Sequence, residues 1–106
     1  MARSPRLPLT ETVYYILLAL LQPAHGYLIM SRVEELSMGQ VRLAPGTLYG
    51  ALDNLVKQRL IARVPSDDPR RKVYRITDGG ADVLAQDARR MAHMIEAYEQ
   101  AQGAER

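Results

Sequence analysis

Three consecutive cations, Arg70, Arg71 and Lys72, follow a turn-forming segment in the second half of the chain. A guanidinium group binds phosphate through a rigid fork of donors, and an ammonium group binds it as a point charge. Residues 60–65 and 72–76 on either side have the composition of strands. The pattern predicts a hairpin whose cationic tip contacts a polyanion, although with Asp67 and Asp68 beside it the tip also fits a simple solvated turn.

A second group of candidate residues surrounds a helix predicted to open at residues 44–46. Its exposed side begins with small residues, which would let a nucleic-acid groove approach closely. Thr47 and Tyr49 can donate hydroxyl hydrogen bonds to phosphate or to a base edge. Alternatively, Tyr49 packs against the hairpin and Thr47 only caps the helix. The candidate contact residues in and beside this helix are Arg42, Pro45, Gly46, Thr47, Tyr49 and Lys57.

The sequence offers little for catalysis or metal binding. It has no cysteine, and its only histidines, His25 and His93, stand far apart. The serines lack a nucleophile-elbow motif, and no histidine or carboxylate cluster has the spacing of metal ligands. We therefore expect neither an enzyme nor a cofactor or metal site.

Charge is distributed unevenly along the chain. Residues 1–77 hold 11 lysines and arginines against 6 acidic residues, whereas residues 78–106 hold 3 against 6. A basic body with an acidic tail favours a polyanionic partner for the body. Chance patterning on a solvated surface would give the same totals.

The remaining pattern predicts three helices, a hairpin and a long final helix. An apolar run at residues 13–21 follows the candidate cap Thr10 and ends before Pro23, and the second helix covers about residues 27–36, with Ile29, Val33 and Leu36 on one face. Residues 24–26 are a short connection, and residues 40–43 are a short strand or an extended linker. The last helix begins near residue 78 and stops at Gly103. This order predicts a mainly α fold with a small β-hairpin (α+β), a winged helix-turn-helix.

The first and last helices carry apolar surface that one small domain has few elements to cover. The first is apolar on every side, and the last has a seam with alternating spacings of four and three. Packing of the last helix onto its own domain is the alternative to a shared interface. We expect a homodimer whose interface comprises Tyr14, Leu17, Leu21, Leu84, Ala88, Met91, Ile95 and Tyr98.

Several short motifs together resemble the PadR family of bacterial transcriptional regulators. They are residues 15–20 (YILLAL), 25–27 (HGY), 46–49 (GTLY), 60–61 (LI) and 74–77 (YRIT) with Gly80 three residues on, and they cover roughly residues 10–85. The resemblance implies a winged-helix DNA-binding domain at 10–77 after an extended arm at 1–9, and a dimerisation helix at 78–106. It also implies repression of nearby genes and, in some relatives, a small planar effector at the dimer interface. The chain has no tryptophan on which such a ligand could stack.

The expected function is sequence-specific binding of double-stranded DNA by a homodimer. Two-fold symmetry would match an inverted-repeat operator with half-sites about 34–36 Å apart. A winged-helix protein-interaction module that does not read DNA is the alternative. The apolar run at residues 13–21 has no cleavage site after it and is shorter than the roughly 20 residues of a membrane span. We therefore expect a cytoplasmic protein without a membrane partner.

Overall fold

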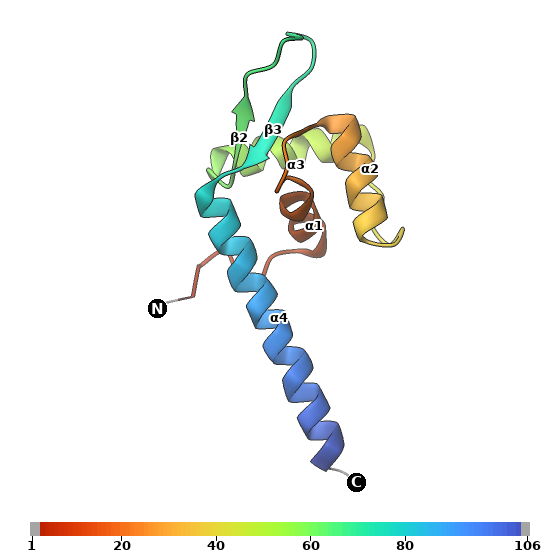
Figure 1. Cartoon of the computed structure of the whole chain (residues 1–106), viewed down its shortest axis with the longest axis vertical. Helices are drawn as coiled ribbons and strands as arrows, with labels where there is room; N and C mark the ends of the chain where they lie inside the picture. The colour runs from red at the N-terminus through yellow and green to blue at the C-terminus, as the bar shows by residue number, and fades with distance from the viewer. Residues whose placement is uncertain (1–2, 105–106) are drawn as a thin grey trace.

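A computed structural model describes residues 3–104 of the chain. Its elements are, in order, α1 (Glu11–Ala19), β1 (Ala24–His25), α2 (Gly26–Leu36), α3 (Pro45–Lys57), β2 (Ile61–Val64), β3 (Val73–Ile76) and α4 (Asp78–Ala104). The first three helices and a small antiparallel sheet form a body from which α4 extends (Figure 1). The predicted fold class and winged-helix order are confirmed. Residues 1–2 and 105–106, the ends of the predicted arm and tail, lie outside the described residues.

The first helix begins where the sequence predicts and ends earlier than predicted. The side chain of Thr10 accepts a hydrogen bond from the backbone N–H of Val13 at 3.2 Å, which caps α1. The helix stops at Ala19 with Leu20 as its C-cap, before Pro23 can interrupt it. The end of the apolar run therefore lies outside the helix, and Leu21 is half exposed.

The core forms from one face of each of the first three helices and from the sheet. The spacing of Leu48, Leu52 and Leu55 predicts one apolar face of α3. All three are buried, and they meet Ile29 and Val33 of α2 in one apolar cluster. The placement of Leu36 on this buried face was wrong. Its side chain is 44% exposed because the end of α2 borders an open hollow beside α1 rather than the core.

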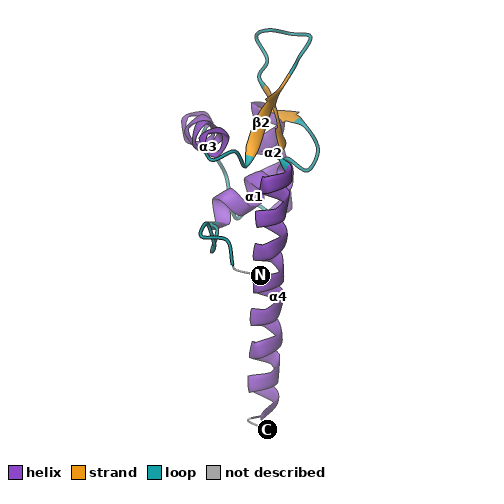
Figure 2. Ribbon diagram, turned by 90° about the vertical axis from the view of Figure 1, so that its left-hand side faces the viewer, coloured by secondary structure: helices purple, strands orange, loops and turns teal. Residues whose placement is uncertain are grey.

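The sheet contains a strand where the sequence predicted only a connection. β1 pairs antiparallel with β3, with Ala24 opposite Tyr74 and His25 opposite Val73. β3 also pairs with β2, so β3 is the central strand, and the hairpin rises above the helices (Figure 2). A two-residue strand is too short to show alternation, which is why no pattern indicated it.

The long helix α4 is anchored closely at its start and free at its end. The Thr77 hydroxyl accepts from the backbone N–H of Gly80 at 3.0 Å and donates to the carbonyl of Arg59 at 2.7 Å. A Cβ on Gly80 would collide with the carbonyl of Leu60, so only glycine fits there. The predicted stop at Gly103 was wrong, since Gly103 is helical and α4 reaches Ala104, the last described residue.

The eight residues expected at a dimer interface fall into three groups by exposure. Leu17 and Leu84 are buried by their own chain, so uncovered apolar surface no longer argues for their place at an interface. Tyr14, Ala88 and Met91 are half-buried, and Leu21, Ile95 and Tyr98 are exposed. The far half of α4 extends beyond the body in both views (Figures 1 and 2). No helix within residues 3–104 is both long and apolar enough to cross a membrane.

Candidate nucleic-acid interface

The exposed side of α3 matches the predicted contact surface. Pro45 opens the helix, and a Cβ added at Gly46 or Gly50 would meet no atom within 4 Å. Thr47 is exposed and makes no side-chain cap hydrogen bond, because the N-cap position is held by Ala44. The first turn of α3 therefore has free backbone donors and open space in front of them.

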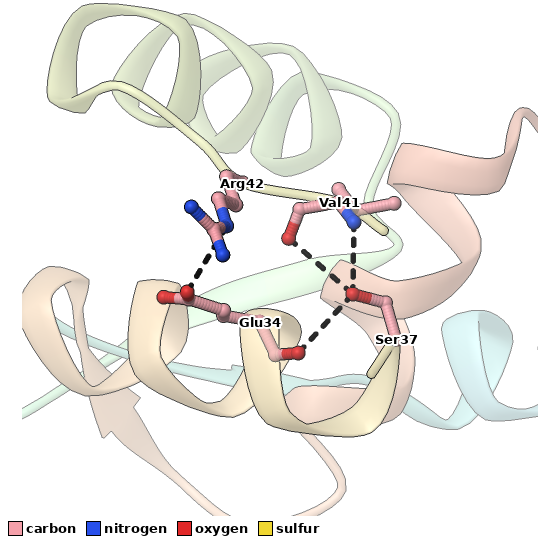
Figure 3. Close-up of polar contacts among 4 residues, drawn as sticks. All are labelled: Glu34, Ser37, Val41 and Arg42. Atoms are coloured by element: carbon pink, nitrogen blue, oxygen red, sulfur yellow. Dashed lines mark hydrogen bonds and ion pairs between the residues drawn. The ribbon is translucent and has the colours of Figure 1, made fainter. Parts of the chain in front are cut away.

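A buried serine fixes the linker that leads into α3. Ser37, which is 3% exposed, accepts from the backbone N–H of Val41 at 2.9 Å. Its hydroxyl also lies 3.3 Å from the carbonyl oxygens of Glu34 and Val41, either of which can accept its proton (Figure 3). Of the two alternatives for residues 40–43, the extended linker is confirmed, since no strand forms there. Sequence analysis assigned Ser37 no role.

Arg42 projects from this linker and pairs with α2. Its Nε lies 3.2 Å from a carboxylate oxygen of Glu34, and both side chains are more than half exposed (Figure 3). An exposed pair of this kind contributes little to stability, on the order of 0–1 kcal/mol. A phosphate could therefore replace the carboxylate of Glu34 at small cost, which keeps Arg42 among the candidate contacts.

The three wing cations occupy the loop between β2 and β3. This was predicted for Arg70 and Arg71, whereas Lys72 was predicted to begin the second strand, which starts at Val73 instead. Arg70 pairs with Asp68 at 3.5 Å, and the same carboxylate accepts from the backbone N–H of Arg70 at 2.9 Å. Arg71 and Lys72 are exposed and form no salt bridge with any described residue. The wing therefore presents two free cations and a third that is partly neutralised.

Sequence analysis missed another cation beside the wing. Arg63 of β2 lies with its guanidinium 5.9 Å from the ring centroid of Tyr74. Together with Lys57 and Lys72 it lines a shallow hollow. Burial raises the pKa of the Tyr74 hydroxyl, and the positive charge of Arg63 partly opposes that rise. Residues 61–64 do not alternate between polar and apolar, and Arg63 shares a face with the buried Ile61. The sequence pattern therefore did not place Arg63 beside Tyr74 or near Lys57.

Tyr49 does not project freely from α3. Its ring lies against Gly26, the first residue of α2, although its side chain remains 42% exposed. Tyr49 also lines a hollow with His25, Tyr27 and the wing loop. Tyr49 therefore does pack, but the contact at Gly26 is with α2 and not with the hairpin that the alternative named, and the residue as a whole stays partly exposed.

The N-terminal segment packs along α3. The guanidinium of Arg6 donates to the side-chain oxygen of Gln58 at 3.3 Å and to its backbone carbonyl at 3.4 Å. The backbone N–H of Ser4 donates to the Gln86 side chain at 3.1 Å, so the same segment contacts α4. Within residues 3–104, no group of three or more His, Asp or Glu side chains could hold a metal ion.

Comparison with known proteins identifies the family. Residues 16–86 match the model of the transcriptional regulator PadR-like family. The chain belongs to this family. The match runs from the last residues of α1 through α2, α3, the sheet and the wing to the start of α4, so it includes every candidate contact residue named above.

Curated relatives share this PadR-like region over part of their length. The chain is 38% identical over 72 residues to an uncharacterised 37.1 kDa protein in transposon Tn4556 of Streptomyces fradiae, covering 68% of this chain and 20% of that protein. It is 33% identical over 73 residues to the transcriptional regulator YqjI of Escherichia coli K12, covering 69% of this chain and 34% of that protein. The chain therefore spans about a fifth and a third of these relatives.

Solved structures agree on the fold. A PadR family transcriptional regulator from Eggerthella lenta has a TM-score of 0.68 and 26% identity, covering 86% of this chain and 80% of that chain. A structure described as the complex structure of hsRosR-S4 has a TM-score of 0.71 and 27% identity, covering 96% and 98%. Both share the expected fold, and the Eggerthella lenta protein is described as a member of the family whose model matches this chain.

Proposed function

We propose that this PadR-like protein is a transcriptional repressor that binds an inverted-repeat operator in double-stranded DNA as a homodimer in the cytoplasm. The observation that supports DNA binding most directly is that Tyr49 of α3 and all three wing cations line one hollow. A helix side and a cationic loop thereby face the same space. A reading helix and a backbone-gripping wing need this arrangement.

In this proposal α3 enters the major groove, which is about 12 Å wide and admits one helix. Gly46 and Gly50 leave room for the groove wall, and Thr47 is free to contact a base edge or phosphate. Arg70, Arg71 and Lys72 bind the backbone or the adjacent minor groove. Arg42 and Lys57 add phosphate contacts at the two ends of α3.

The homodimer forms through the uncovered apolar residues of α4, with Tyr14 of α1 and Leu21, which follows α1, as further contacts. Met94, Ile95 and Tyr98 are 48%, 59% and 64% exposed, which is unusual for such large apolar side chains on one helix. Pairing this stripe with its two-fold copy would cover both. The division into an arm (1–9), a DNA-binding domain (10–77) and a dimerisation helix (78–106) follows, and a small apolar effector would bind between the paired helices.

Selection of bound duplexes from random-sequence DNA tests the proposal. The expected result is an enriched inverted repeat whose half-sites lie about one helical turn apart. Failure to enrich any sequence, together with no retention on DNA resin in low salt, would indicate the protein-interaction alternative. An enriched direct repeat or a single half-site would contradict the two-fold arrangement while leaving DNA binding intact.

A further inference from the structure

The hollow beside the wing has two walls of different chemistry. The loop supplies a cationic wall, in which Arg70, Arg71 and Lys72 outnumber the single carboxylate of Asp68. That carboxylate is already occupied by Arg70 at 3.5 Å. The net charge of this wall is therefore positive, with Arg71 and Lys72 unpaired among the described residues.

The opposite wall consists of uncharged hydrogen-bond donors. The Tyr49 hydroxyl lies against Gly26, and the neighbouring Tyr27 is 78% exposed, so its phenol is open to solvent. His25 lines the same hollow, and its Nδ1 accepts from the backbone N–H of Leu28 at 3.4 Å. In that state the imidazole proton lies on Nε2, which makes the ring a further donor.

The two walls are tied together by the sheet. His25 is the ladder partner of Val73, and Val73 directly follows Lys72. The base of the wing is thus paired in the sheet with the residue that precedes Tyr27 by two positions. This pairing holds the backbone next to Lys72 beside the backbone next to Tyr27.

We propose that this hollow seats one backbone phosphodiester of the bound duplex between Lys72 and Arg71 on one side and the hydroxyls of Tyr27 and Tyr49 on the other. The inference rests on the proposed function and extends it, because it adds Tyr27 and the start of α2 to the contact surface. A phosphate offers an anionic charge to the cations and acceptor oxygens to the phenols, so it matches both walls. Such a contact fixes the position of α3 along the duplex without reading a base.

Phosphate neutralisation in a selected duplex tests the seat. Single backbone phosphates are replaced by uncharged methylphosphonates, and affinities are measured by fluorescence anisotropy for the wild type, Tyr27→Phe, Lys72→Gln and the double variant. Tyr27→Phe should weaken binding about tenfold, as expected for a lost hydrogen bond to a charged group. Lys72→Gln should reduce the slope of log K against log salt by about one.

The distinguishing result is coupling between the variants and one phosphate. At one position in each half-site, neutralising the phosphate should weaken binding by the wild type but not by the double variant. The losses of affinity caused by Tyr27→Phe and Lys72→Gln should also be less than additive. Arg75→Gln removes a cation from β3, which follows Lys72, at a position outside the hollow, and Tyr15→Phe removes a phenol from α1. Both controls should retain the wild-type sensitivity at that position.

Three outcomes would overturn the seat while leaving DNA binding established. In one, every neutralised position weakens the double variant as much as the wild type. In another, Tyr27→Phe binds like the wild type. In the third, Lys72→Gln has the same slope of log K against log salt as the wild type, which would show that its ammonium makes no phosphate contact. Failure of the wild type to bind any duplex would instead contradict the proposed function.

Discussion

The phenol of Tyr49 in α3 lies directly on Gly26, the first residue of α2. A Cβ added at Gly26 would stand 2.8 Å from Cζ of the tyrosine ring and would overlap its hydroxyl. This contact joins the start of α2 to the exposed face of α3. It explains why residues 25–27 and 46–49, which are far apart in sequence, form one structural unit.

Substituting Gly26→Ala should displace the Tyr49 ring rather than unfold the protein, because the ring can rotate away. We expect a loss of about 1 kcal/mol in the free energy of unfolding, typical of modest overpacking. Urea denaturation would measure it. In a chain that already carries Tyr49→Ala, Gly26→Ala should lower the free energy of unfolding much less. An equal loss with Tyr49 and with Ala at position 49 would show that the added Cβ and the tyrosine ring do not clash.

A larger effect is expected at Gly80, where the obstacle is backbone. A Cβ there would overlap the carbonyl oxygen of Leu60 and approach Cγ1 of Ile76 to 2.8 Å. Gly80→Ala should therefore cost more than about 2 kcal/mol, since α4 must move away from the sheet. A Cβ added at the neighbouring Gly79 would come no closer than 3.8 Å to any atom, so Gly79→Ala is a matched control that should be neutral or stabilising. Similar melting temperatures for the two variants would contradict this account of the start of α4.

Removing the wing arginines should weaken binding to all duplexes alike. Arg70→Ala with Arg71→Ala should reduce the salt dependence of affinity by up to about two counterions, since each phosphate contact contributes about 0.9 to the slope. Thr47→Ala should instead reduce the ratio between the affinity for a specific duplex and the affinity for random-sequence DNA. Anisotropy titrations at several salt concentrations separate these effects, and an unchanged slope for the double arginine variant would remove the wing from the interface.

Charge placed on the exposed stripe of α4 should dissociate the proposed dimer. Ile95→Lys and Tyr98→Lys put an ammonium into the apolar seam, where it would be desolvated. Gln100→Lys places the same charge on the opposite side of the helix and should leave the dimer intact. Sedimentation at micromolar concentration should give a monomer for the first two variants and a dimer for the third. If the wild type is a monomer at that concentration, the proposed homodimer is wrong.

Alkaline pH should destabilise the folded protein through ionisation of the buried Tyr74 hydroxyl. Its folded-state pKa is raised by burial above the unfolded value near 10, so the folded state holds its proton more tightly. The contribution to stability is fully present below about pH 10 and is lost as the pH rises through the folded pKa. The wild type should lose more stability than Tyr74→Phe when urea denaturation is repeated above pH 10. Parallel losses in the two proteins would assign the alkaline effect to other groups.

The sequence predicted the regular elements because their signals are local. The Leu48, Leu52 and Leu55 spacing placed the buried face of α3, and the turn residues before Arg70 placed the wing. Apolar character alone did not separate core residues from residues of the proposed dimer surface. Leu17 and Leu84 are apolar because they belong to the core, and only tertiary packing separates them from Ile95 and Tyr98.

The parts of the site that escaped sequence analysis depend on long-range contacts. Nothing in the sequence distinguishes Ser37 from the other serines, and its role follows only from the hydrogen bond that its hydroxyl accepts from Val41. In the same way, Arg63 is distinguished from the other arginines only by its position over the ring of Tyr74. The position of Tyr27 beside the wing follows from the pairing of His25 with Val73. The hydrophobic periodicity of a sequence reports local structure and cannot predict a pairing between residues almost fifty positions apart.

The most direct test of the central claim compares a selected duplex with a scrambled duplex of the same composition in the same salt. Because specific binding usually exceeds non-specific binding by at least about 10³-fold, anisotropy should show a ratio of that order for the wild type. Raising the salt should weaken both complexes, as expected for phosphate contacts. Equal affinity for the two duplexes at every salt concentration would contradict the proposal that this protein reads DNA sequence.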